Sequence, residues 1–240
     1  MRRISRLAAA ALVLAMGMAP SAALAEQIEL GATQSPLVAP VCPSGVSSAN
    51  CTIILTRVTA IETLRDGVAY PTRVTHAGRI VAFTVGLSQL SSNKSTQKSF
   101  IHFLDATYGG TTRVAITVLA PVGKRTQWQW KVVAESPIYH VEPYLGQVVQ
   151  IPLENSIEVK PGEVIALTTP TWAPVLTIGL ASKKFAYRQS RKANCNNPPS
   201  SSQAQLTVGL TTSYACDYPG TRPEYSATEF TYPGGSNPVH

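Results

Sequence analysis

The 240-residue sequence lacks the short motifs by which many enzymes and metal sites are recognised. It has no G-x-S-x-G, the elbow that exposes the nucleophilic serine of an α/β-hydrolase, and no D-x-D-x-D loop of the calcium-binding kind. Its four cysteines are too far apart for the C-x₂₋₄-C pairs usual in a zinc site. No other motif has a defined chemistry, so we expect no cofactor and no catalytic residues.

Charged side chains and helical patterns are also scarce. Only 14% of the residues are charged and 44% are hydrophobic, which is far from the composition of a disordered chain. The 18 prolines argue against long helices, and no apolar stripe after the first 25 residues has a helical period. No stretch there is long and apolar enough to cross a bilayer, and no repeat indicates a propeller or solenoid.

The first 25 residues have the pattern of a secretory signal peptide. Its positive head consists of Arg2, Arg3 and Arg6. An apolar run follows at residues 7–19, and residues 23–25 (ALA) precede Glu26 as a small-x-small cleavage site. We therefore predict a secreted protein that begins at Glu26. No lipobox cysteine follows this site and no sorting motif is found, so we expect free secretion.

Cleavage there would leave about 215 residues, enough for one sizeable β domain or at most two small domains. The remaining 17 basic and 13 acidic side chains give a net charge of +4 in place of +7. We expect residues 26–40, rich in Pro, Ala, Ser and Thr, to form a flexible leader or an extended arm, and residues 41–240 a single domain. A mild positive charge suits contact with an anionic envelope polymer, although it is ordinary for an exported protein.

The cysteines are expected to form disulfides, because an exported chain with an even number of them usually does. Three pairings are open. We favour the local one, Cys42–Cys51 and Cys195–Cys216, because each pair brackets a loop-like stretch rich in Pro, Ser and Asn.

From residue 52 onward, short β-rich segments alternate with turn signals. The clearest is residues 111–120 (TTRVAITVLA), in which β-branched apolar residues alternate with small or polar ones. Other predicted strands are residues 52–59, 79–87, 99–106, 128–135, 147–153, 163–169, 175–180, 204–213 and 227–232. We therefore predict an all-β fold, an antiparallel β-sandwich with jelly-roll-like topology.

Four patterns of turns and strands occur in order between residues 78 and 167. They are G-x-I-x-x-F at 78–83, a V-x-V-L-x-P strand end with Ile in first place at 116–121, E-S-P at 135–137, and V-x-P-G-E-x-I-A-L at 159–167. In these patterns the segment resembles exported, non-catalytic β-sandwich domains of Gram-positive actinobacteria. The resemblance implies export and a sandwich fold, and it supplies no catalytic residue.

The tryptophans are the best indication of a binding site. Trp128 and Trp130 are two residues apart, so on a strand both rings project from one face, where they could stack on sugar rings or on a partner. The alternative is that both pack into the core. Trp172, between Pro170 and Pro174, is expected in a loop folded over the sheet edge.

A basic run interleaved with aromatic residues precedes Cys195. It consists of Lys183, Lys184, Phe185, Tyr187, Arg188, Arg191 and Lys192. Such a run can bind a polyanion. Export makes nucleic acid a poor partner, so we expect an anionic envelope polymer, or else a solvated strand and loop. Our predicted ligand-binding residues are Trp128, Trp130, Lys183, Lys184 and Arg188.

Carboxylates and histidines allow a catalytic or metal-binding alternative. Candidate carboxylates are Glu62, Asp66, Asp105, Glu135, Glu142, Glu154, Glu158 and Glu163. Glu135 and Glu142, close to the tryptophans in sequence, form the best sugar-facing pair for a glycosidase. On a strand His140 would share a face with Glu142, and His102 would oppose Asp105. Two ligands do not fix a metal, so we expect none.

The sequence thus favours a secreted, non-catalytic module at or outside the cell envelope that binds carbohydrate or an anionic wall polymer. The alternatives are a secreted hydrolase of glycosidase or esterase type, and a protein-interaction or inhibitor module that presents the Cys195–Cys216 loop. An enzyme should gather titratable groups in one pocket. A lectin-like module should expose an aromatic platform, and an interaction module a flat apolar patch.

Overall fold

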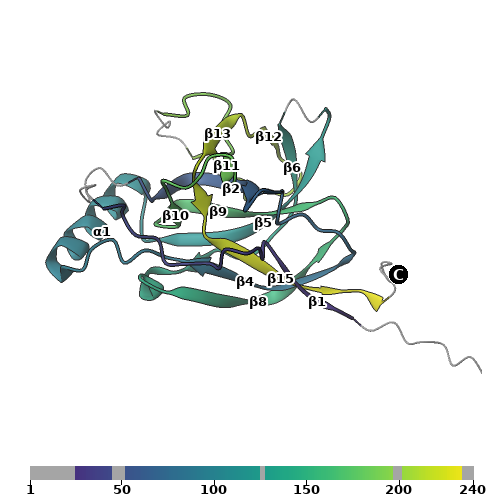
Figure 1. Ribbon diagram of the computed structural model, residues 1–240, viewed down its shortest axis with the longest axis horizontal. Coiled ribbons are helices and arrows are strands. Elements are labelled where there is room, and N and C mark those ends of the chain that lie inside the picture. The colour runs from purple at the N-terminus through teal and green to yellow at the C-terminus, as the bar shows by residue number, and fades with distance from the viewer. Residues whose placement is uncertain (1–24, 45–51, 125–127, 197–201, 234–240) are drawn as a thin grey trace, which may run out of the picture.

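The computed structural model describes residues 25–44, 52–124, 128–196 and 202–233 of the chain. In these ranges, antiparallel sheets of four, two and nine strands are accompanied by one α-helix, so the predicted all-β fold is confirmed (Figure 1). The sandwich and jelly-roll connectivity stay predictions. No helix of the described residues is long and apolar enough to span a membrane.

The four-stranded sheet joins the two ends of the described chain. Its strands, in spatial order, are β1 (Gln27–Leu30), β15 (Tyr225–Thr231), β4 (Gly78–Gly86) and β8 (Val148–Val159). The first residue of β4 must be glycine, because a Cβ at Gly78 would lie 2.5 Å from the carbonyl oxygen of Phe230.

The nine-stranded sheet has β5, β9 and β2 at its centre. Its main path is β12 (Thr211–Ser213), β6 (Gln129–Glu135), β5 (Arg113–Val122), β9 (Val164–Ala173), β2 (Leu55–Arg65), β11 (Ala186–Gln189) and β13 (Cys216–Pro219). The short strands β3 (Val68–Ala69) and β7 (Tyr139–His140) pair with β2 and β5. A separate pair consists of β10 (Leu176–Thr177) and β14 (Arg222–Pro223).

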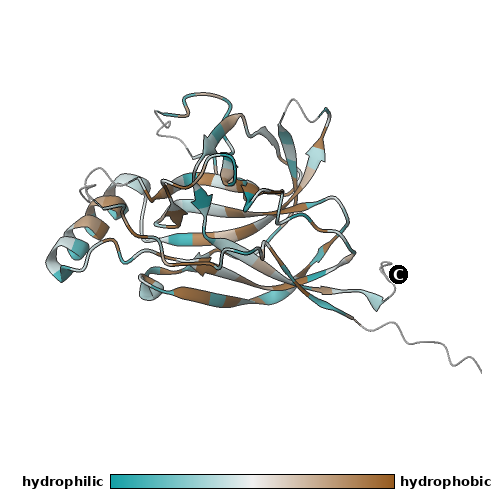
Figure 2. Cartoon of the chain, viewed as in Figure 1, coloured by the Kyte–Doolittle hydropathy of each residue, from teal (hydrophilic) through white to brown (hydrophobic). Residues whose placement is uncertain are grey.

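The two larger sheets share one hydrophobic core. Ile116 and Val118 of β5 lie in the same buried cluster as Ile80 and Phe83 of β4. A second cluster, with Leu119 among its members, uses alternate residues of the central strands. Successive residues of β9 are therefore buried on both faces, and hydrophobic segments run through the middle of both sheets in Figure 2.

The predicted strand at residues 99–106 is wrong, because this segment lies in helix α1 (Lys94–Tyr108). The Asn93 side chain accepts the Thr96 N–H at its start, and Gly109, with φ 87°, ends it. Both capping residues are visible in the sequence. Phe100, Leu104 and Tyr108 have helical spacing, but Phe100, Ile101 and Phe103 are residue types that favour a strand.

The leader at residues 26–40 is bound to the domain, so it is an extended arm and not a free tether. Residues 27–30 form β1, which is antiparallel to β15. Further along, the hydroxyls of Thr33 and Ser35 donate to the carboxylate of Asp66 at 2.6 and 2.7 Å. The Val38 N–H donates to Glu224 Oε2 at 3.2 Å. These contacts span the predicted leader.

The predicted loop position of Trp172 is wrong. The residue is fully buried in β9, beneath α1. It packs against Leu104, and its Nε1–H donates to Asp105 Oδ1 at 2.9 Å. The strand tolerates Pro170 because its register with β2 shifts between Thr56 and Val58. The prolines on either side of Trp172 therefore do not mark a loop.

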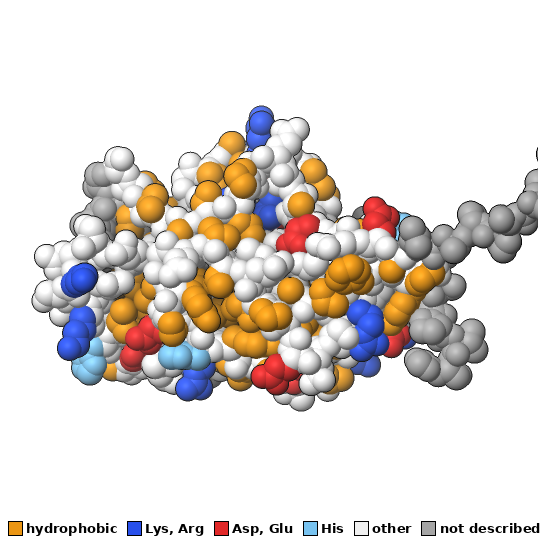
Figure 3. All heavy atoms as spheres, turned by 90° about the horizontal axis from the view of Figure 1, so that it is seen from below, with side chains coloured by type: hydrophobic (Ala, Val, Ile, Leu, Met, Phe, Trp, Pro, Cys, Tyr) orange, Lys and Arg blue, Asp and Glu red, His pale blue; other side chains and the backbone are white. Residues whose placement is uncertain are grey.

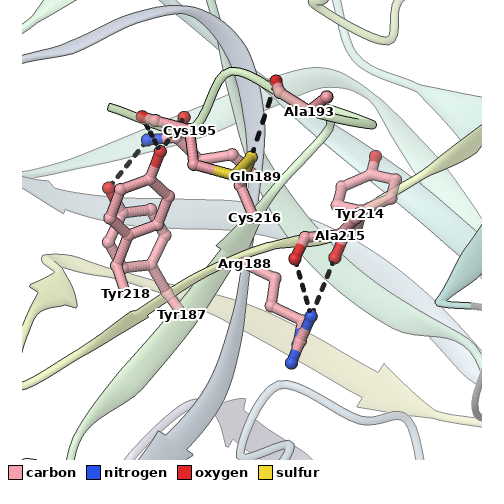
Figure 4. Close-up of a disulfide and its surroundings, with 9 residues drawn as sticks. All are labelled: Tyr187, Arg188, Gln189, Ala193, Cys195, Tyr214, Ala215, Cys216 and Tyr218. Carbon is pink, nitrogen blue, oxygen red and sulfur yellow. Dashed lines mark hydrogen bonds between the residues drawn. A yellow bond between two sulfur atoms is a disulfide. The ribbon is translucent and has the colours of Figure 1, made fainter. Parts of the chain in front are cut away.

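The predicted Cys195–Cys216 disulfide is confirmed, with Cα atoms 5.3 Å apart. It joins the loop after β11 to the first residue of β13 (Figure 4). Cys51 lies outside the described residues, so the Cys42–Cys51 pair stays a prediction.

Candidate ligand-binding site

Trp128 and Trp130 line the same cavity, which has a volume of about 270 Å³. We call it the Trp cavity. Tyr70, Arg73, Lys124 and Gln129 also line it. The cavity therefore combines three aromatic rings with two cationic side chains, and none of the described residues that line it is acidic.

The two tryptophans of the Trp cavity differ in their burial and in how they are held. Trp130 is 6% exposed and belongs to the second hydrophobic cluster, with its ring centroid 5.9 Å from that of Tyr70. Trp128 is partly exposed. It lies just before β6 with φ 49°, a conformation that few non-glycine residues adopt. Its carbonyl accepts the Tyr214 N–H at 2.8 Å, which helps hold this turn in place.

Arg188 of β11 stacks on Trp128, with its guanidinium carbon 3.6 Å from the ring centroid. It donates to the carbonyls of Tyr214 and Ala215 at 3.2 Å each (Figure 4). It also pairs with Asp217 at 3.3 Å. Arg188 is thus fixed against one face of the Trp128 ring, and the rest of the ring is left to the cavity.

Arg73 is the second cation of the Trp cavity, and its guanidinium carbon lies 5.1 Å from the Tyr70 ring centroid. Its Nε is buried and has no hydrogen-bond partner among the described residues. An isolated antiparallel β-bridge between Arg73 and Val164 of β9 holds the Arg73 backbone beside the cavity. A buried N–H without an acceptor favours a ligand that brings one.

The other predicted ligand-binding residues lie elsewhere. Lys183 and Lys184 are exposed in the turn before β11 and do not line the Trp cavity. Alternation along β11 then separates the rest of the basic run. Arg188 faces Trp128, whereas Tyr187 and Arg191 line a different cavity.

Three glutamates line a separate cavity of about 530 Å³, which we call the acidic cavity. They are Glu135, Glu158 and Glu163. Burial raises the pKa of Glu135 and Glu163 above the usual range of a carboxyl. Oε2 of Glu135 is buried and has no hydrogen-bond partner among the described residues.

The predicted grouping of Glu135 with Glu142 and the tryptophans is not what the structure shows. Glu142 lies 3.7 Å from His140, outside the acidic cavity, and the tryptophans line the Trp cavity. His102 lies on α1 and is exposed, while Asp105 accepts from Trp172. Among the described residues no three His, Cys, Asp or Glu side chains form a group that could hold a metal.

Hydrophobic side chains gather on the outer face of the four-stranded sheet (Figure 3). Val148 of β8 and Phe230 of β15 are 44% and 42% exposed. An apolar face of this kind is what the interaction-module alternative requires.

No family model, curated protein or solved structure matches this chain. The resemblance of residues 78–167 to exported actinobacterial domains therefore stays a prediction.

Proposed function

We propose that the protein is a secreted, non-catalytic module that binds an anionic polysaccharide or wall polymer in the Trp cavity. One observation carries the proposal: Tyr70, Trp128 and Trp130 share a cavity with Arg73 and Lys124, without an acidic side chain among its described lining residues.

The chemistry of this wall matches a sugar that carries negative charge. Aromatic rings offer broad apolar surfaces to the C–H faces of sugar rings. The Arg73 guanidinium, with its unmatched Nε–H, can donate to a carboxylate or phosphate oxygen. Arg188 and the Tyr214 contact hold Trp128 in place before binding, which reduces the entropy lost on association.

The test is retention of the purified chain, starting at Glu26, on insoluble polysaccharides and cell-wall fractions. Trp128→Ala and Arg73→Gln should each weaken retention by about tenfold, the equivalent of roughly 1.4 kcal/mol. Lys94→Gln removes one exposed positive charge from α1 and should change nothing. Circular dichroism checks the fold of each variant.

Trp130 is left unchanged in this test, because truncating so buried a ring would disturb the core. Equal retention of the wild type and a folded Trp128→Ala variant would overturn the site. Absence of retention on every polymer would overturn the proposed function.

A second candidate function, a secreted glycoside hydrolase, is favoured by the acidic cavity. Glycoside hydrolysis needs a carboxyl that stays protonated as the acid and a second carboxyl across the cleft. The raised pKa of Glu135 suits the acid, and Glu158 and Glu163 line the same cavity. Release of reducing ends from wall polysaccharide, abolished by Glu135→Gln but not by Glu154→Gln on exposed β8, would establish this function. The absence of release by wild type would exclude it for the polymer tested.

A further inference from the structure

Arg191 is a buried cation that has no carboxylate partner within the described part of the chain. Arg191 is 4% exposed, and among the described residues its guanidinium donates one hydrogen bond, from Nη2 to the Thr56 carbonyl at 3.2 Å. Nε and Nη1 are buried and donate to no partner among the described residues, and no ion pair of those residues includes Arg191. Burial lowers the pKa of this guanidinium.

Arg191 lines a cavity of about 350 Å³, which we call the Arg191 cavity. The neighbouring walls come from Tyr187 and Gln189 of β11, Tyr218 of β13, and Asn196. Threonine hydroxyls and aliphatic side chains of the β2 and β10 region complete it. Among these described lining residues none is acidic, and Arg191 supplies the only positive charge.

The walls are held in position before any ligand binds. The Tyr187 and Tyr218 rings stack with centroids 4.9 Å apart, and the Gln189 amide donates to the Tyr187 hydroxyl at 2.8 Å. The Tyr218 hydroxyl donates to the Cys195 carbonyl at 2.7 Å, beside the disulfide to Cys216 (Figure 4). These contacts fix the loop and the strands relative to each other.

A buried guanidinium with unmatched N–H groups is costly unless acceptors and a negative charge reach it. A planar carboxylate supplies both, because its two oxygens match the guanidinium fork. A doubly charged phosphate would call for further cations, and Arg191 is the single cation of the described lining. The volume limits the ligand to a compact molecule such as one sugar or one small acyl amino acid.

From these contacts we propose that the Arg191 cavity binds the carboxylate of a small organic acid, either a uronic acid or an acylated amino acid. This site is separate from the Trp cavity, because Arg191 and Arg188 belong to opposite faces of the β11 segment. Its success or failure therefore does not depend on the polymer-binding function proposed above.

The first experiment is calorimetric titration of the full mature chain with sodium glucuronate and with N-acetylalanine. Glucose and N-acetylalanine amide are the matched neutral controls. Binding of either acid, with its neutral control at least about tenfold weaker, supports the site, and the tighter acid identifies the source of the carboxylate. Equal binding of both acids supports a site that recognises only the carboxylate group. Failure of both acids to bind overturns the proposal, and so does sulfate binding as tightly as the acids.

Two variants locate the binding. Arg191→Gln should weaken the acid by about tenfold or more, and Trp128→Ala should leave it unchanged. The reverse pattern would place the acid in the Trp cavity and overturn the proposal. A readout on the wild type needs no variant that might misfold: the Arg191 Nε–H resonance in a ¹H–¹⁵N spectrum should shift as the acid is added. An acid that binds without moving this resonance does not bind at Arg191.

Discussion

At the scale of single residues, Glu229 is the clearest buried carboxyl without a partner. It lies in β15 with 0% exposure, and neither carboxyl oxygen has a hydrogen-bond partner among the described residues. Burial raises its pKa from 4.5 to about 7. The folded state therefore holds this proton over a range of pH in which the unfolded chain has released it.

The stability contributed by this proton is fully present below about pH 4.5 and is lost as pH rises through about 7. We predict that the free energy of unfolding falls across this window, and that Glu229→Gln removes on the order of 3 kcal/mol of that fall. Urea unfolding at a series of pH values measures it. Exposed Glu154→Gln on β8 is the control and should leave the profile unchanged.

A residual slope should persist in the Glu229→Gln variant, because burial raises the pKa of Glu62 to about 8 in spite of Arg65 2.7 Å away. Ionisation of Glu62 as the pH rises also lowers the free energy of unfolding. A profile of Glu229→Gln identical to that of the wild type would contradict the assignment of the slope to Glu229.

At the scale of elements, helix α1 contributes one buried side chain, Leu104, to its contact with the domain. Leu104 is 2% exposed and packs with Trp172, whereas its neighbour Phe103 is 56% exposed. The sequence prediction of a strand would bury Phe103 and Leu104 on opposite faces, so the two residues also test the corrected assignment.

We predict that Leu104→Ala lowers the free energy of unfolding by about 2–5 kcal/mol, the usual cost of deleting a buried leucine side chain. Phe103→Ala, the adjacent control, should change it by less than about 0.5 kcal/mol. Thermal or urea unfolding measures both variants. Equal losses for the two would contradict the placement of Leu104 in the core and of Phe103 at the surface.

The sequence predicts strands well where apolar residues alternate over many positions, as in β4, β5 and β9. It misses β1 and β13, because these short strands are fixed by their neighbours and carry little pattern of their own. Helix α1 is missed for a different reason: its aromatic and β-branched residues favour a strand, although Asn93 and Gly109 are good helix caps.

The residues of the candidate site are also only partly predictable from the sequence. The pairing of Trp128 with Trp130 follows from their spacing, and Arg188 belongs to the basic run that the sequence shows. Tyr70 and Arg73 have no local signal, because they join the cavity only through the tertiary bridge to β9. The buried state of Arg191 is equally invisible, since a basic run is usually solvated.

At the scale of the whole molecule, the start and end of the described chain are joined through β1 and β15. Leu30 is buried, and the Glu29 carboxylate accepts from the hydroxyls of Ser226 and Thr228. β1 therefore covers the edge of β15 and satisfies polar groups beside it.

We predict that a chain starting at Gly31 is less stable than one starting at Glu26 by about 3 kcal/mol or more, because it loses the burial of Leu30 and bares a strand edge. Urea unfolding measures the loss, and size-exclusion chromatography should show association of the shorter chain. If the two chains have the same free energy of unfolding and the same elution volume, residues 26–30 are a dispensable tether.

The pairing of β1 with β15 also sets an order in time. Glu26 and Thr231, which hydrogen-bond to each other, are 205 positions apart. Since a chain is synthesised from its N-terminus, β1 is made long before β15 and cannot pair until β15 is available. The four-stranded sheet therefore depends on a pairing across most of the described chain, and such long-range pairing is slow.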